Sequence, residues 1–200
     1  MANDEAVEQL RQGTMRWMAW RGNPDRLDLL NADLKGLFLP DVDLSGARLA
    51  DADLSQAKMI GGFFRLADLS GARLEGCELL GANFGNADLS GIRLQRATAT
   101  NATFDHANLA GAKLIGAILT GARFLSAFML RAELLDADLR RAEFSGAVLT
   151  QANLSNAKLH GARFISCYDI ETVILTGARY DRTTRWPRGF DASTKGAIME

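Results

Sequence analysis

The chain has 200 residues, of which 48% are hydrophobic and 24% are charged, and its formal net charge at pH 7 is −1. This length fits one domain with small appendages, and the near-neutral charge provides no general attraction for nucleic acid. The acidic N-terminus, MANDEAVEQL, lacks the apolar core of a secretory signal, and no run approaches the roughly 18 apolar residues of a membrane span. We therefore expect a cytoplasmic protein that contacts neither nucleic acid nor a membrane directly.

Residues 4–21 predict a helix. Acidic side chains occupy its first turn, where the positive end of the helix dipole favours them, and apolar residues follow at helical spacing. Gly22, with Pro24 two residues later, ends the pattern. Because the arginines of this segment are balanced by acidic residues, a membrane-surface helix is disfavoured, and we expect a cap over the structure that follows.

From Leu29 to Phe164 an apolar residue recurs at every fifth position, in a continuous frame. These 28 centres are nineteen Leu, six Phe, two Met and one Ala, and the position two residues before each centre is Ala in 22 cases. Five residues turn an α-helix by about 500° and invert the face of a flat strand, so neither element preserves the pattern. It is preserved if the chain turns a corner once per repeat, so that the centre and the small residue before it both point inward. The Asp, Asn, Ser and Gly residues between them suit such corners.

Phenylalanine occupies every fourth centre along most of this region. A spacing of twenty residues predicts four sides per turn, and the 28 centres then make seven coils. Adjacent coils bonded like parallel strands lie about 4.8 Å apart, which brings the rings within stacking distance. We interpret this ladder as core: Phe64, Phe84, Phe104, Phe124, Phe144 and Phe164.

The phrase ADLSG, intact at 67–71 and 87–91, resembles the A-[D/N]-[L/F]-x-x motif of pentapeptide repeat proteins. The resemblance covers roughly residues 28–180, and the flanking phrases WRGNP and RWPRGFD are similar to those of many cyanobacterial members. It implies an all-β solenoid, a right-handed quadrilateral parallel β-helix of about seven to eight coils with four pentapeptides each. The handedness is implied by the family and not by the periodicity.

The resemblance and the repeat frame together divide the chain into three parts. We expect an N-terminal helical cap over 1–25, the β-helix over 26–180 and a short C-terminal cap over 181–200. The frame slips by one residue after Phe164, which predicts a bulge or widened corner near Tyr168. Beyond it, the aromatic residues of the tail are expected to shield the open edge of the last coil.

Few residues suggest catalysis or metal binding. His106 and His160 are 54 residues apart and have no Cys or His at ligand spacing. Cys77 and Cys167 are ninety residues apart on small inward positions, so we expect buried free thiols. No phosphate-binding loop or nucleophile motif is present, and the corner pattern accounts for the many aspartates. We predict no enzyme activity, no cofactor and no metal site.

The remaining candidates are outward side chains. On the fifth and sixth coils these are unusually apolar and suggest a contact surface: Ile115, Ile118, Leu125, Phe128, Leu130 and Leu135. A second set forms a basic stripe that suits an acidic partner or remains a solvated face: Arg73, Arg93, Arg96 and Lys113.

These patterns favour a non-enzymatic scaffold that binds an unidentified protein partner, as a monomer or a homodimer. One alternative follows from the resemblance to quinolone-resistance pentapeptide repeat proteins, which bind DNA gyrase by imitating duplex DNA. The repeat region carries 17 acidic and 16 basic residues, an even balance that disfavours a DNA mimic. Another alternative, by family analogy alone, is a regulator of cyanobacterial differentiation or stress.

Overall fold

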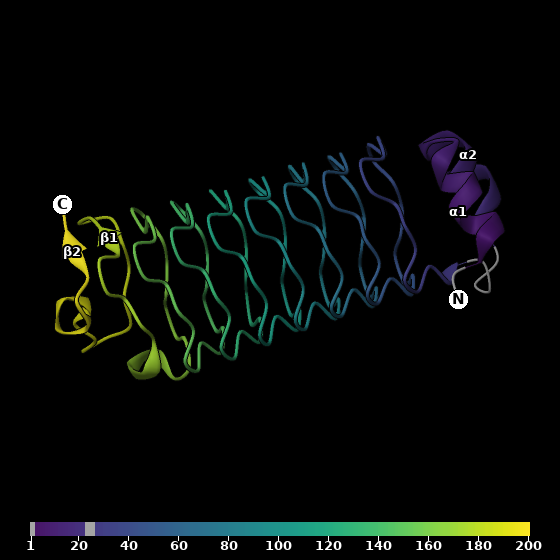
Figure 1. The fold of residues 1–200 in the computed structure, drawn as a ribbon. Coiled ribbons are helices and arrows are strands. Elements are labelled where there is room, and N and C mark those ends of the chain that lie inside the picture. Colours follow the sequence, from purple (N-terminus) through teal and green to yellow (C-terminus); the bar gives the residue numbers. More distant parts are fainter. Residues whose placement is uncertain (1–2, 23–26) are drawn as a thin grey trace.

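The computed structural model describes residues 3–22 and 27–200, and these form an elongated rod with the two chain ends at opposite tips (Figure 1). Two helices lie at one tip and two short strands at the other. The expected boundary between the N-terminal segment and the repeats, at residues 25 and 26, lies outside the described residues. The regular elements of the described part are α1 (Asp4–Arg11), α2 (Thr14–Trp20), the 3-10 helix η2 (Ile170–Thr172), β1 (Arg179–Tyr180), the 3-10 helix η3 (Ala192–Lys195) and β2 (Ile198–Met199).

The predicted single helix over 4–21 is wrong, because the segment forms two helices. Helix α1 ends before Gln12, and Gly13 adopts φ +98°, a conformation that L side chains rarely adopt. This break lets α2 turn onto the first coil. Trp17 is fully buried there, and its Nε1 donates a hydrogen bond of 2.8 Å to the backbone oxygen of Asp43.

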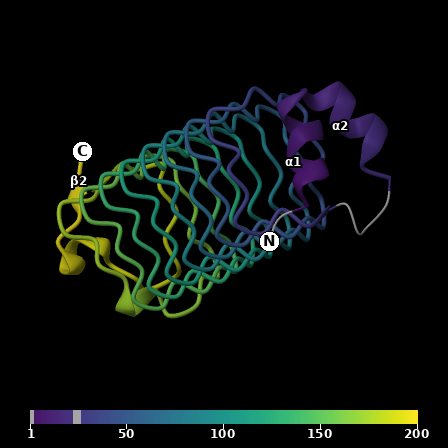
Figure 2. The same cartoon turned by 45° about the vertical axis from the view of Figure 1, so that its right-hand side comes forward.

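Between the two tips, parallel bridges link outward residues of successive coils in four columns. Figure 2 shows these coils stacked along one axis, with the helix pair at the N-terminal end. We name the four faces A, B, C and D after their first bridged residues, which are Asp28, Asp33, Phe38 and Asp43 respectively. Residues twenty apart are therefore neighbours on one face, and residues ten apart lie on opposite faces.

Backbone hydrogen bonds join each inner coil to both of its neighbours. Around one side, Arg93 N donates to Ala72 O at 2.9 Å, and Leu94 N donates to Lys113 O at 2.7 Å. The corner contributes a further bond of 3.1 Å, from Arg96 N to Ile115 O. Because this pattern repeats along the rod, the four faces are held rigidly relative to one another.

The corners are tight turns with one left-handed residue each. Ala97 N donates to Leu94 O at 3.1 Å, and Arg96, the third residue of that turn, has φ +58°. A positive φ at the third position alone is typical of a type II turn, which favours Gly or Asn there. Other side chains also occupy this position, including Leu66 at φ +60°.

The interior consists of stacked columns of small and large apolar side chains. All six ladder phenylalanines are fully buried, and successive rings are stacked with centroids 4.7–5.0 Å apart. Trp186 continues this column beyond Phe164, at 4.6 Å and an interplanar angle of 9°.

The repeat register changes twice near the C-terminal tip. Asn153 pairs with Ile174, which is 21 residues later, and the extra residue is accommodated at the corner that contains η2. This is the corner at which the sequence predicts a bulge. A second extra residue precedes Arg185, which pairs with Arg163 at a separation of 22 residues. Finally, β2 pairs in parallel with β1 and closes the described chain.

Candidate interaction surfaces

The chemically reactive side chains are dispersed in the structure. The described residues contain no group of three or more His, Cys, Asp or Glu side chains arranged to hold a metal ion. His106 lies at a corner with φ +59°, whereas His160 contacts Glu200 through Nε2 at 3.0 Å. Among the helices of the described segments, none has the length and apolar character needed to cross a membrane.

Both cysteines are free: Cys77 is buried in the core, and Cys167 is half-buried and packs against it. The Cys77 thiol donates to the backbone oxygen of Leu54, and the Cys167 thiol donates to that of Phe144. Burial raises the pKa of each thiol to about 12, so both remain protonated and poorly nucleophilic near neutral pH.

The structure divides the six apolar residues predicted on coils five and six between opposite sides of the rod. Phe128 belongs to face A, because it pairs with Asn108 and Val148. Ile118 belongs to face C, where it pairs with Thr98 and Asp138. The register therefore places Leu125 and Leu130 at the corners beside Phe128, while Ile115 and Leu135 share the corner between faces B and C.

The part on face A extends further toward the C-terminal tip than the sequence reasoning recognised. Val148 bridges Phe128 to Tyr168, and Tyr168 is 64% exposed. Ile165, at the same corner as Leu125, is 39% exposed. The twenty-residue spacing of Phe128, Val148 and Tyr168 is the sequence signal that would have identified this column, whereas Ile165 is forty residues from Leu125 with Ser145 between them. We call the set the face A apolar surface: Leu125, Phe128, Leu130, Val148, Ile165 and Tyr168.

Three members of the basic stripe form a continuous column on face B, and Arg96 lies at the adjoining corner. Arg93 is bridged to Arg73 on one side and to Lys113 on the other. Arg73 has acidic neighbours, Asp53 at 3.7 Å and Glu75 at 3.9 Å. Within residues 3–22 and 27–200, no acidic side chain pairs with the other three members of the stripe, which are Arg93, Arg96 and Lys113.

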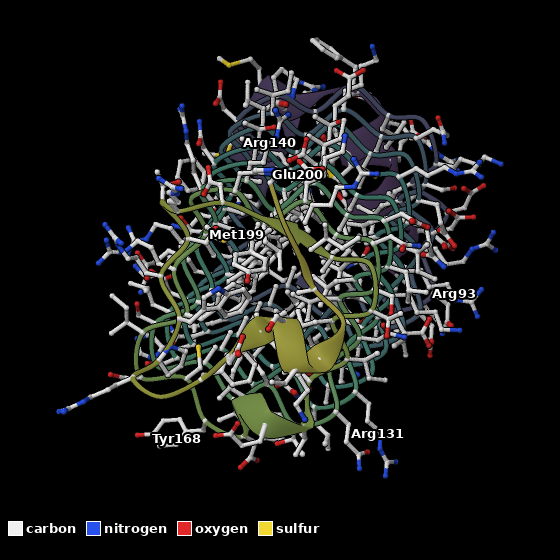
Figure 3. The ribbon with its side chains drawn as sticks, turned by 90° about the vertical axis from the view of Figure 1, so that its left-hand side faces the viewer. Arg93, Arg131, Arg140, Tyr168, Met199 and Glu200 are labelled. Atoms are coloured by element: carbon white, nitrogen blue, oxygen red, sulfur yellow. The ribbon has the colours of Figure 1, made fainter. Side chains whose placement is uncertain are left out.

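Figure 3 shows the rod from its C-terminal tip and separates these surfaces. Arg93 projects from one side, Tyr168 lies at the lower edge, and Arg140 lies in the upper half of the view near Glu200. The face A apolar surface and the basic stripe therefore lie on different sides of the rod.

A polar hollow of about 500 Å³ lies at the corner between faces C and D near the C-terminal tip. Its cations are partly neutralised within the chain: Arg140 pairs with Asp138 at 2.6 Å. Asp181 contributes a carboxylate that accepts hydrogen bonds from Thr183 and Thr184. The Thr183 hydroxyl is the main reason that the pKa of Asp181 is lowered to about 2. The charged side chains of the hollow are thus paired with groups of the same chain.

A further group of exposed apolar residues lies near the N-terminal tip, and the sequence reasoning did not recognise it. Ile60 and Leu80 follow one another at the corner between faces C and D, and are 38% and 45% exposed. Phe63, on the adjoining face D, is 45% exposed.

A four-sided parallel solenoid built from five-residue repeats is the class of protein that these features define. Pentapeptide repeats match the sequence in 8 copies, over residues 28–65, 67–104, 87–124 and 132–168. The chain belongs to the pentapeptide repeat family, as its repeated phrases predicted. The family and its solved structures imply a right-handed quadrilateral β-helix.

Two solved structures illustrate the likeness. QnrB1 in a trypsin-treated form, described as a plasmid-mediated fluoroquinolone resistance protein, is 24% identical with a TM-score of 0.68, and the match covers 78% of this chain and 79% of that one. HetL of the cyanobacterium Nostoc sp. strain PCC 7120, described as involved in heterocyst differentiation regulation, is 24% identical with a TM-score of 0.59, and the match covers 100% and 94% respectively. At this level of identity the likeness concerns the fold. No curated protein matches the chain.

Proposed function

We propose that this protein is a non-enzymatic, cytoplasmic scaffold that uses its flat outer faces to bind a protein partner. The observation that carries the proposal is the face A apolar surface. Its side chains lie outside a core that is already closed by stacked Phe, Leu and Ala residues. A contiguous apolar group on a rigid surface is typical of a protein contact. Pentapeptide repeat proteins are generally non-enzymatic, which agrees with the dispersed reactive side chains.

The rod holds its outward side chains in fixed relative positions. Coils joined to both neighbours by backbone hydrogen bonds cannot shift independently, so a partner meets a surface that is already ordered. Preorganisation of this kind reduces the entropy that is lost on binding.

We further propose that the repeats form about seven to eight coils over 26–180, with caps at both ends. Helices α1 and α2, which lie within the proposed N-terminal cap over 1–25, are suited to this role, since Asn3 N donates to Asp28 O at 2.9 Å and Trp17 is buried against the first coil. The tail over 181–200 is suited to the second cap through the stacking of Trp186. Covered ends prevent the rods from pairing end to end.

A paired set of aspartate substitutions tests the face A apolar surface. Phe128 and Ile118 have equal exposures of 43% and occupy equivalent positions on opposite faces. Phe128→Asp combined with Tyr168→Asp places charge in the proposed contact and is expected to abolish partner capture from host cells, or to convert a homodimer to a monomer. Ile118→Asp is the matched control and is expected to leave both properties unchanged.

Two measurements decide the outcome, namely mass by light scattering and affinity purification with identification of the captured proteins. Loss of a contact in the face A double variant, with retention in the control, supports the proposal. If the double variant keeps the wild-type mass and captures the same proteins, the face A apolar surface is not the interface.

The charge distribution disfavours the alternative of a DNA mimic that binds gyrase. Such a mimic requires acidic faces, whereas face B carries three adjacent cations, Arg73, Arg93 and Lys113. A gyrase supercoiling assay with a fluoroquinolone discriminates between the two functions, because protection of gyrase would favour the mimic.

A further inference from the structure

The basic stripe departs from the charge pattern of the rest of the rod. On the other faces, a cation at a bridge position is usually beside an acidic residue of the adjacent coil. Arg48 pairs with Asp28 at 3.0 Å, and Arg163 pairs with Glu143 at 2.8 Å. Arg93 instead has a cation on each side, so like charges are held at the spacing of adjacent strands. Repulsion between them favours an external anion that neutralises them.

The neighbouring corner adds a cation and two apolar side chains. Arg96 N donates to Ile115 O at 3.1 Å, and Gly116 N donates to Leu135 O at 2.8 Å, so these corner residues lie on successive coils. A Cβ atom on Gly116 would lie 3.8 Å from the Cγ of Arg96, which shows that the arginine stem passes over the glycine. Ile115 and Leu135 are half-buried beside it. Cationic and apolar side chains therefore share one continuous surface.

The basic part of this surface is short. The charge of the bridged residues on face B becomes negative on both sides of the cations, with Asp53 before Arg73 and Glu133 after Lys113. The three cations between them span about 10 Å, which matches three to four residues of an extended chain. A long polyanion or a flat anionic membrane would also meet the flanking acids. A short acidic segment over the cations meets fewer of these acids, and Glu133 and Asp136 border Leu135 at the edge of the surface.

We propose that this surface, formed by Arg93, Arg96, Lys113, Ile115 and Leu135, binds a short acidic segment of a partner protein that also carries apolar side chains. Carboxylates of the segment pair with the guanidinium groups and the ammonium group, and its apolar side chains pack on Ile115 and Leu135. The proposal deepens the scaffold function by naming the chemistry of one partner, and it concerns a different face from the face A apolar surface.

Fluorescence anisotropy with short labelled peptides tests the proposal at low ionic strength, where screening is weak. The probe is a peptide of repeating Glu-Glu-Leu triplets, compared with a Glu-Glu-Ser peptide and a Lys-Lys-Leu peptide. The wild-type protein is expected to bind the Glu-Glu-Leu peptide most tightly and the Lys-Lys-Leu peptide not at all.

Charge reversal separates a specific surface from general attraction. Arg93→Glu with Lys113→Glu is expected to weaken binding of the Glu-Glu-Leu peptide by about tenfold or more. Arg65→Glu with Lys158→Glu makes the same charge change on other parts of the surface and is expected to weaken it far less. Both control residues are exposed. Equal losses in the two variants would overturn the proposal.

The apolar contribution is tested separately with Ile115→Ser combined with Leu135→Ser. This variant is expected to remove the preference for the leucine peptide over the serine peptide while retaining binding of both. Tighter binding of single-stranded DNA or of vesicles containing phosphatidylserine than of the Glu-Glu-Leu peptide would also contradict the proposal.

The variant with Phe128→Asp and Tyr168→Asp makes failure of this proposal distinguishable from failure of the scaffold function. It is expected to bind the Glu-Glu-Leu peptide like the wild type. A protein that captures its partner through the face A apolar surface but binds no acidic peptide would overturn only the present inference.

Discussion

The coils between residues 44 and 164 and the segment after Phe164 both stack on a shared aromatic column. They differ in the number of residues that each turn of the coil uses. The first region maintains a constant separation of twenty residues between bridged positions, whereas the second uses separations of 21 and 22 and, between β1 and β2, of 19. Both nevertheless continue one aromatic column, since Trp186 stacks on Phe164 as each Phe stacks on the next. The interior therefore requires continuity of the column, and the corners can accommodate extra residues.

The comparison is tested most directly by removing one ring from each region. Phe104→Ala deletes a ring enclosed between two others and is expected to cost about 3–5 kcal/mol in the free energy of unfolding. Trp186→Ala removes a half-buried ring at the end of the column and is expected to cost about 2 kcal/mol, because one side is less enclosed. Urea unfolding followed by circular dichroism measures both losses.

Thr103→Ala, at the outward position beside Phe104, serves as the control and is expected to change stability by less than about 0.5 kcal/mol. A loss below about 1 kcal/mol for Phe104→Ala would mean that its ring is not enclosed as the structure indicates.

Substitutions at the left-handed corner positions are expected to change the free energy of unfolding by a smaller amount, with a sign set by the backbone strain. Gly111 has φ +65° and open space around its missing Cβ, so Gly111→Ala is expected to cost roughly 1 kcal/mol through backbone strain alone. Leu66→Gly, at φ +60°, removes the same kind of strain and is expected to stabilise the protein by up to about 1 kcal/mol. Equal signs for the two substitutions in urea unfolding would show that strain does not govern the corners.

The smallest expected effect is local and concerns the C-terminal segment. The lowered pKa of Asp181, about 2, means that its ionised form is favoured by folding, since an unfolded Asp titrates near 4. Its contribution is complete above the unfolded pKa and is lost as pH falls through the folded value. The protection of the Thr183 and Thr184 amides against hydrogen exchange, measured relative to the intrinsic exchange rate at each pH, is therefore expected to fall toward pH 2.

Asp181→Asn is expected to flatten that pH dependence while leaving the amides of the middle coils unaffected. An unchanged acid response in this variant would assign the effect to another group.

The surfaces were less predictable than the interior. The apolar residues of coils five and six appeared as one group because they are close in sequence, but half a coil separates Ile118 from Phe128 and places them on opposite faces. The basic column on face B was predictable, because Arg73, Arg93 and Lys113 repeat at twenty residues. By contrast, the sequence could not predict that no acidic side chain in the described part of the chain pairs with Arg93, because ion pairing depends on side-chain positions across adjacent coils.

By itself, the sequence determined the five-residue side, the four-sided coil and the closed aromatic core, since a period of five is compatible with burial only if the chain turns at every repeat. Only the tertiary structure decided the break of the N-terminal helix at Gly13, the continuation of the column by Trp186 and the division of the outer residues among faces. The physical reason is that a buried column repeats one constraint along the chain. Surface contacts and irregular ends instead depend on which distant residues the finished coils bring together.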